Sequence, residues 1–246
     1  MSVFEKRCYV EVKDVASRGF LTNEGFLNLL ENAACSHSEV AGFGINQMEQ
    51  THLSWVLLQW KVKILKRVLY NTPILVKTWA KAANKCLTYR DFEMYDENNE
   101  LLGVASTKWS LVNTQTGRIA RITPEIINCY SPEDSRNVFE EVDIPKLREP
   151  ECVENIQPSY TFTVSRRDID MNQHMHNLYY LDYAVEALPE EVYQNLDCNQ
   201  FEIMYKNGAK LGETVNCFYI NEEGQHIVIM KNAEDNRLHA IIQFKK

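Results

Sequence analysis

The sequence lacks the signals that mark several large classes of protein. Its seven cysteines form no C-x-x-C pair, so neither a zinc ribbon nor a dithiol redox motif is indicated. No run reaches the roughly 18–20 apolar residues that a membrane-spanning helix needs. Neither a G-x-S-x-G elbow nor a glycine-rich phosphate loop occurs, so serine-hydrolase and nucleotide chemistry have no support.

Positive charge is also scarce. The chain has 26 Lys and Arg against 34 Asp and Glu, a net charge of −8. A nucleic-acid-binding protein needs a concentrated basic surface, so nucleic acid is not an expected partner. The first twelve residues, MSVFEKRCYVEV, contain charges but no apolar core, which is unlike a secretory signal peptide. An odd, scattered set of cysteines suits reduced thiols, and we expect a cytoplasmic protein without a membrane span.

What the chain does contain is an internal duplication. Residues 9–34 and 160–188 each read as an alternating strand, a polar turn and a segment with apolar residues at helical spacing. A repeat of about 140–150 residues is the size of a duplicated domain. The segments that follow correspond in order, 55–83 with 199–224 and 89–113 with 226–246.

The duplication predicts the fold class. Each unit reads as one long helix followed by about four long strands, and hairpin connections make the sheet antiparallel. A curved antiparallel sheet wrapped around a long helix is an α+β solution, the hot-dog fold, here in tandem. We predict an N-terminal hot-dog domain at 1–130, a proline-containing linker at 131–158 and a C-terminal hot-dog domain at 159–246. Five of the seven prolines fall within 114–158.

The second repeat contains a polar turn, DIDMNQHMHN, at residues 168–177. Asp170, Asn172 and His174 alternate, so in an extended segment they would face the same side, just ahead of a helix that starts near Asn177. A helix N-terminus offers free N–H groups to a developing oxyanion. His174 suits a general base, Asp170 a group that orients the imidazole or a water, and Asn172 a donor to a carbonyl oxygen.

The residues alone leave two other interpretations open. Such a turn is also typical of a helix cap whose side chains are solvated. Alternatively, His174 and His176, with Asp168 or Asp170, resemble a partial metal site that lacks an evident fourth ligand.

Residues 166–189, RRDIDMNQHMHNLYYLDYAVEALP, resemble the signature of the acyl-acyl carrier protein (acyl-ACP) thioesterases of plants and bacteria. The similarity extends over nearly the whole chain, including GFLTNEGFLNLLENAACSHSEVAGFG and WVLLQWKVKI. Met175, His176 and Tyr183 depart from the usual Val, Asn and Trp. The signature positions that match are Asp168, Asp170, Asn172, His174, Asn177, Tyr180, Glu186 and Pro189.

The resemblance implies an enzyme with no metal and no cofactor. It would hydrolyse the thioester between a fatty acyl chain and the phosphopantetheine arm of ACP, which terminates fatty acid synthesis. Asp170, Asn172 and His174 match the family's catalytic residues. The equivalent turn of the first repeat, SRGFLTNEG, has no His. We therefore expect the chemistry in the C-terminal domain and the acyl pocket in the N-terminal domain.

One departure concerns the residue that activates water. Many members carry a Glu at a position that falls on Gly208-Ala209 in this sequence. The resemblance therefore implies that Asp170 or His174 activates the water. If position 208 is a vacant base position, Gly208→Glu should raise the rate about tenfold or more.

Two further groups are candidates for binding. One group lies on a strand that reads as buried on both faces and consists of Trp55, Leu58 and Trp60. These residues are expected to bind substrate together with Asn177. The alternative is that the three strand residues are ordinary core. Arg166, Arg167, Arg118 and Arg121 form a basic group that would dock the acidic carrier protein or be a solvated surface. The alternatives are an acyl-CoA thioesterase and a non-catalytic acyl-binding hot-dog protein, and the fold leaves room for a homodimer.

Overall fold

The computed structural model describes residues 2–16, 19–195 and 198–245. Residues up to Ile144 group into a first compact unit and residues from Pro145 into a second. The segment predicted as a linker, 131–158, is thus divided between the units. Among the described residues no helix combines the length and apolarity that crossing a membrane requires.

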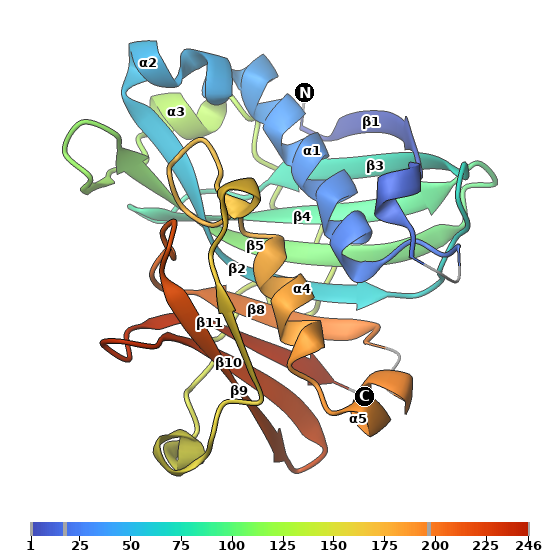
Figure 1. Ribbon diagram of the computed structural model, residues 1–246. Helices are drawn as coiled ribbons and strands as arrows, with labels where there is room; N and C mark the ends of the chain where they lie inside the picture. The colour runs from blue at the N-terminus through green and yellow to red at the C-terminus, as the bar shows by residue number, and fades with distance from the viewer. Residues whose placement is uncertain (1, 17–18, 196–197, 246) are drawn as a thin grey trace. The chain divides into compact units, whose positions relative to one another are not determined.

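The first unit is an antiparallel sheet with a long helix, α1 (Asn23–Ala41), lying across one face (Figure 1). Thr22 caps the start of the helix, where its hydroxyl accepts a hydrogen bond from the Gly25 N–H, and the left-handed residue Gly42 caps its end. A short strand, β6 (Ile119–Ala120), pairs with β5. The sheet order is β1 (Phe4–Tyr9), β3 (Pro73–Ala80), β4 (Leu87–Asp96), β5 (Leu101–Asn113) and β2 (Leu53–Ile64).

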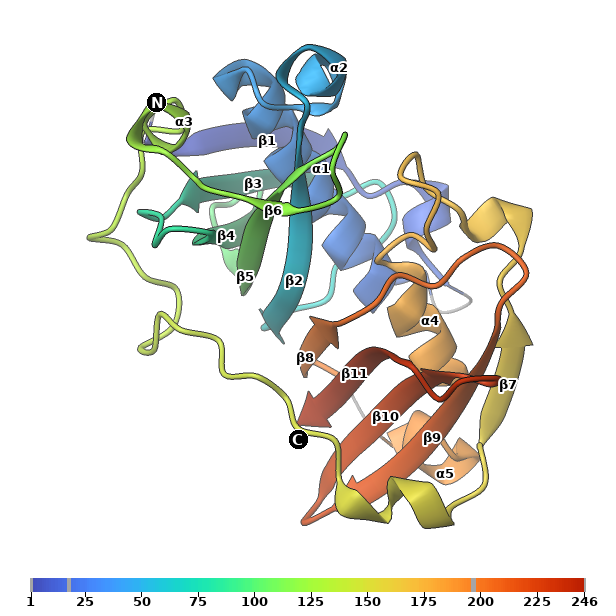
Figure 2. The ribbon, with the colours of Figure 1, turned by 90° about the vertical axis from the view of Figure 1, so that its left-hand side faces the viewer.

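The second unit repeats this order, as Figure 2 shows from β7 to β8. The strands are β7 (Tyr160–Thr163), β9 (Thr214–Glu222), β10 (Gln225–Asn232), β11 (Leu238–Lys245) and β8 (Gln200–Tyr205), all antiparallel. The predicted tandem hot-dog fold is therefore confirmed.

The helix of the second unit is shorter than the long helix predicted. Helix α4 (Tyr179–Glu186) has eight residues, and a separate short helix, α5 (Glu190–Asn195), follows. Pro189 lies between them and disfavours the helical conformation of the residue before it, so α4 ends at this point.

A matching antiparallel pairing of two residues precedes the helix in both units. Val15 pairs with Leu21 in the first unit, and Ile169 pairs with Met175 in the second, each across six residues. The matching positions are Ala16 and Asp170, Gly19 and Gln173, Phe20 and His174, and Leu21 and Met175.

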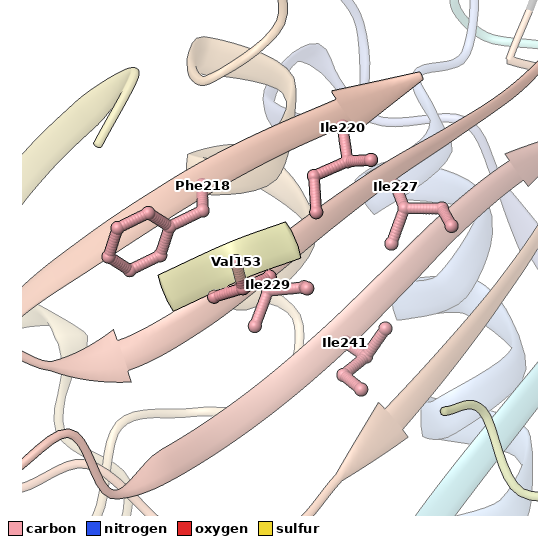
Figure 3. Close-up of a cluster of buried hydrophobic side chains, with 6 residues drawn as sticks. All are labelled: Val153, Phe218, Ile220, Ile227, Ile229 and Ile241. Carbon is pink, nitrogen blue, oxygen red and sulfur yellow. The ribbon is translucent and has the colours of Figure 1, made fainter. Parts of the chain in front are cut away.

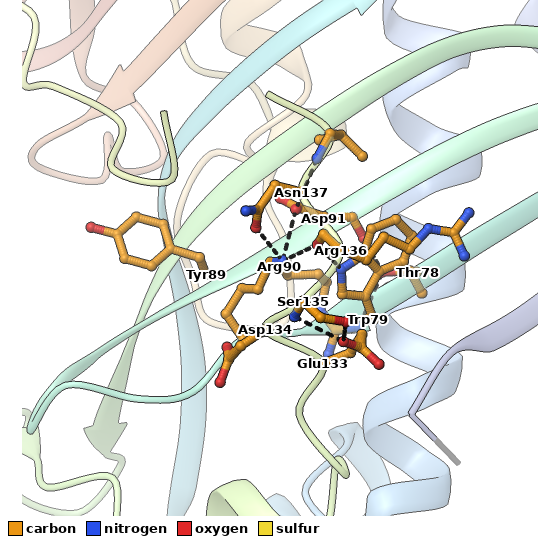
Figure 4. Close-up of polar contacts among 12 residues, drawn as sticks. Thr78, Trp79, Tyr89, Arg90, Asp91, Glu133, Asp134, Ser135, Arg136 and Asn137 are labelled. Atoms are coloured by element: carbon orange, nitrogen blue, oxygen red, sulfur yellow. Dashed lines mark hydrogen bonds and ion pairs between the residues drawn. The ribbon is translucent and has the colours of Figure 1, made fainter. Parts of the chain in front are cut away.

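Residues 131–144, which we call the strap, cover the first sheet on the face opposite α1 (Figure 4). Arg90 points to the helix side, where it contacts His37 of α1, so its strand neighbour Asp91 points to the strap side. There Lys81 lies 3.4 Å from Asp91 and donates to the carbonyl oxygen of Arg136 and, at 2.7 Å, to Asn137 Oδ1. The strap is held by buried charge and hydrogen bonds.

The second sheet has an apolar counterpart. A one-turn 3₁₀ helix, η3 (Glu151–Asn155), places Val153 on a cluster of buried aliphatic and aromatic side chains (Figure 3). The strand residues of this cluster are Phe218, Ile220, Ile227, Ile229 and Ile241.

Candidate active site

The polar turn of the second unit is closed rather than extended. It follows a 3₁₀ helix, η4 (Arg166–Asp168), and is closed by two main-chain hydrogen bonds, Asp170 N to His174 O at 2.8 Å and Gln173 N to Asp170 O at 3.1 Å. Gln173 has a left-handed φ of 64°. The expectation that an extended segment aligns the three polar residues is therefore wrong, because a tight turn brings them together.

The carboxylate of Asp170 holds this turn. Its Oδ1 accepts hydrogen bonds from the main-chain N–H groups of Asn172 at 2.8 Å and His174 at 3.2 Å. Its Oδ2 lies 3.5 Å from the amide nitrogen of Asn172. The hydrogen bonds of Asp170 thus go to the turn itself and not to the imidazole ring of His174.

The imidazole of His174 is half-buried. Within the part of the chain that the structure describes, neither ring nitrogen has a hydrogen-bond partner. Both nitrogens are therefore free to meet water or a bound substrate.

Asp170, Asn172 and His174 do not cap α4. The N-cap residue of that helix is Leu178, which makes no side-chain cap hydrogen bond, and its own N–H donates to Nδ1 of His176 at 3.4 Å. The helix begins at Tyr179, two residues after the predicted start, and the main-chain oxygen of Asn177 accepts a hydrogen bond from the Tyr205 hydroxyl at 2.9 Å. Asp170, Asn172 and His174 therefore belong to a turn that precedes the helix, and they do not form the helix cap that the sequence alone left open.

The buried side chain of Asp168 has a structural role. Its carboxylate is 1% exposed and accepts hydrogen bonds from the N–H and hydroxyl groups of Ser165, both at 2.7 Å, and from the Tyr183 hydroxyl at 3.3 Å. Its main-chain oxygen accepts from the His176 N–H at 2.7 Å. Among the described residues no group of three or more His, Cys, Asp and Glu is arranged to hold a metal ion.

Sequence reasoning missed the loop that lies against the turn. A Cβ placed on Gly208 would lie 2.7 Å from His174 Cδ2 and 2.8 Å from Cγ, so the imidazole packs directly on the Gly208 main chain. Next to it, Ala209 accepts from the Met175 N–H at 2.8 Å and donates to the Tyr180 hydroxyl at 2.9 Å. Tyr180 matched the family signature, but nothing in the pattern pointed to this contact. The space at position 208 is not vacant.

The residues expected to bind substrate lie in both units. Trp60 of β2 is fully buried, and its ring centroid lies 5.6 Å from that of Phe92. Trp55 donates to the Tyr130 hydroxyl at 2.7 Å, and Leu58 lies half-buried at an irregularity of β2. These three belong to the first unit, whereas Asn177 belongs to the second.

The four arginines expected to dock a carrier protein are all exposed. Arg118 and Arg121 flank β6 in the first unit. Arg166 and Arg167 form η4 in the second unit, directly before the polar turn. Arg167 Nε lies 3.4 Å from Oδ1 of the buried Asp168, while the side chain of Arg167 is itself 83% exposed.

Two units with one strand order define a tandem hot-dog protein, and the second unit carries a polar turn suited to acyl chemistry. The chain belongs to the acyl-ACP thioesterase family. The acyl-ACP thioesterase N-terminal domain matches residues 1–130, and the C-terminal domain matches residues 154–246.

Curated relatives carry corresponding names. The oleoyl-acyl carrier protein thioesterase 2, chloroplastic, of Arabidopsis thaliana is 27% identical over 242 residues, which cover 92% of this chain and 65% of the relative. The palmitoyl-acyl carrier protein thioesterase, chloroplastic, of Cuphea hookeriana is 27% identical over 83% of this chain and 51% of the relative. The chain thus spans less than two thirds of the length of these relatives.

Solved structures share the fold. An acyl-ACP thioesterase from Bacteroides thetaiotaomicron superposes with a TM-score of 0.85 at 23% identity, over 99% of this chain and 97% of that one. The 12:0-ACP thioesterase from Umbellularia californica gives a TM-score of 0.81 at 19% identity, over 100% and 97% of the two chains.

Proposed function

We propose that this protein hydrolyses fatty acyl-ACP to a free fatty acid and holo-ACP, which terminates fatty acid synthesis. The observation that carries the proposal is the imidazole of His174, whose two nitrogens have no partner among the described residues, on a turn shared with Asn172. Family membership supplies the thioester substrate class.

The chemistry would proceed by attack of water on the thioester carbonyl. His174 takes a proton from the water as its oxygen bonds to the carbonyl carbon. The Asn172 amide donates to the developing oxyanion. As the carbon–sulfur bond breaks, the imidazolium returns the proton to the departing sulfur of the phosphopantetheine arm. Asp170 contributes by keeping the turn closed.

The substrate and its surroundings follow from the same proposal. The acyl chain would lie in the first unit near Trp55, Leu58 and Trp60, with Asn177 near the thioester, and the carrier protein would dock on the arginines. All seven cysteines are among the described residues and none is in a disulfide, which supports a reducing compartment such as the cytoplasm. A homodimer remains a prediction.

Release of free thiol from acyl-ACP tests this function. His174→Ala should lower the rate about 100-fold or more, because the base is removed. Met171→Ala, a change of an exposed residue in the same turn, is the matched control and should leave the rate within about twofold. If wild type releases thiol no faster than His174→Ala, His174 does not catalyse hydrolysis and the proposed function fails. Faster turnover of acyl-CoA than of acyl-ACP would instead identify an acyl-CoA thioesterase.

A further inference from the structure

We infer that Gly208 is a positioning residue for His174, because the main chain at 208 is the surface on which the imidazole rests. The geometric part of the inference stands on contacts within the second unit. Its kinetic consequence rests on the proposed thioesterase function.

The first step is the reason for glycine at this position. Gly208 is not among the residues with positive φ, so its backbone conformation is open to any amino acid. A Cβ there would meet three atoms of His174, Cδ2 at 2.7 Å, Cγ at 2.8 Å and Cβ at 3.1 Å. Room for the imidazole is therefore what glycine provides at 208.

The second step is that hydrogen bonds on both sides of Gly208 hold its loop in place, so the loop cannot move away from His174. On one side of Gly208, the Asn207 carbonyl accepts from Nδ1 of His239, a fully buried residue, at 2.8 Å. On the other side, Ala209 is bonded through its oxygen to the Met175 N–H and through its N–H to the hydroxyl of Tyr180, which is 2% exposed. A side chain at 208 would therefore displace the ring rather than the loop.

The far end of the loop is fixed as well. The Lys210 N–H donates to Glu213 Oε2 at 3.0 Å, and Glu213 is held in turn by Arg237 at 2.6 Å. Partial burial raises the pKa of Glu213, but the hydrogen bond from the Lys210 N–H and the charge of Arg237 together outweigh it, so the pKa lies below its ordinary value. The carboxylate therefore stays charged and bonded at neutral pH.

The third step is that few forces hold the ring in place. The His174 ring has no hydrogen-bond partner among the described residues, so packing on Gly208 and the closed turn set its orientation. A contact of this kind gives way without the loss of a hydrogen bond, and the ring would swing toward solvent.

The first unit supplies an internal comparison. The hydrogen bond from Leu21 N to Val68 O, 2.8 Å, corresponds to that from Met175 N to Ala209 O. The residue that corresponds to Gly208 is therefore Arg67. Its guanidinium donates to Leu21 O at 3.0 Å, and the aromatic residue in the place of His174, Phe20, is 43% exposed. Where a side chain is present at this position, the neighbouring ring is more exposed than the half-buried ring of His174.

Residue 208 and the imidazole thus compete for one space. An acid at 208 cannot be added to His174 in its present place, and Gly208→Glu is expected to slow the reaction. This reverses the expectation drawn from the family resemblance.

Kinetics of Gly208→Ala test the inference against a matched variant. Gly208→Ala should lower kcat about 10- to 100-fold with KM within about twofold, because a displaced base affects the chemical step. The control is Gly212→Ala in the same loop, where a Cβ meets nothing within 4 Å but the φ of +84° is strained. It should lose stability and keep kcat within about twofold. An unchanged kcat for Gly208→Ala, or a raised rate for Gly208→Glu, contradicts the inference.

Nuclear magnetic resonance gives a readout that does not depend on activity. Wild type should show a nuclear Overhauser effect between the Gly208 α-protons and the His174 ring proton on Cδ2. The His174 ring signals should shift in Gly208→Ala and stay in Gly212→Ala. Absence of the effect in wild type overturns the geometry. A wild type that hydrolyses no thioester but shows the effect refutes the proposed function alone.

Discussion

Arg90 and His37 form an unusual pair of ionisable residues in the core of the first unit. The guanidinium is 6% exposed, and its Nη1 donates to His37 Nδ1 at 3.0 Å and to Thr78 Oγ1 at 3.2 Å. Burial lowers the pKa of Arg90 to about 10. Burial, with the adjacent Arg90 charge, lowers the pKa of His37 to about 3. His37 is therefore neutral and accepts the hydrogen bond from Arg90.

This pair makes stability fall with acidification. The unfolded His37 takes up a proton near its ordinary pKa of 6.5, whereas the folded one does so only near 3. Its contribution is therefore full above about pH 6.5 and is lost as pH falls toward 3. Between pH 7 and pH 5 the free energy of unfolding should drop by about 1–2 kcal/mol, measured with urea. His37→Asn retains an acceptor without this titration and should flatten the slope. An equal slope in both proteins would exclude His37 as the cause.

The sequence predicts which residues form the candidate site but not which hydrogen bonds each of them makes. Asp170, Asn172 and His174 could be selected because their chemical types and spacing match a known signature. Their hydrogen bonds could not be predicted from the sequence. The Asp170 carboxylate reaches the main-chain N–H groups of Asn172 and His174 only because the turn is closed. The contact of Gly208 with His174 joins residues 34 positions apart, so no local pattern contains it.

At the level of elements, strands and hairpins could be predicted from the sequence, because alternating apolar residues and turn residues are local patterns. Two features could not be predicted in this way. The length of α4 was overestimated because apolar residues at helical spacing continue to Leu188, past the end of the helix at Glu186. The strap contains few apolar residues, so its sequence does not indicate that it packs on a sheet. Its contacts with Lys81 and Asp91 are seen only in the tertiary structure.

The strap should respond strongly to loss of a single charge. Lys81→Met leaves the Asp91 carboxylate buried without its partner, and we expect a loss of about 3 kcal/mol in the free energy of unfolding. Burial already raises the pKa of Asp91, so the isolated carboxyl is poorly tolerated in its charged form.

The double variant Lys81→Met/Asp91→Asn is the control for this effect. It removes both charges and should recover at least half of the loss, measured by urea unfolding. Additive losses in the two single variants and the double variant would mean that the two charges do not interact.

On the scale of the whole molecule, positive charge stands out because the chain is negative overall. A carrier protein that is acidic would be steered by local arginines against a net charge of −8. Arg166 is exposed and lies four residues before Asp170 in the sequence, which makes it the arginine best suited to a test.

Charge reversal at Arg166 should affect one substrate selectively. Arg166→Glu is expected to raise KM for acyl-ACP about 3- to 10-fold and to leave KM for acyl-CoA nearly unchanged, with the difference shrinking at high salt. Arg148→Glu, an exposed arginine of the same unit, is the matched control and should have little effect on either. Equal effects on the KM of both substrates would show that Arg166 does not contact the carrier protein.

The two units use different residues at matching positions next to the same strand pairing. In the first unit the left-handed residue is Gly19, and Ala16 opens the turn with no polar side chain. In the second it is Gln173, which is strained there by about 1–2 kcal/mol, and the carboxylate of Asp170 binds two N–H groups across the turn. We therefore expect the residues suited to positions 170 and 173 to depend on each other. A relative with glycine at the second position is released from the need for an acid at the first, so loss of that acid in such a relative is no evidence of lost catalysis.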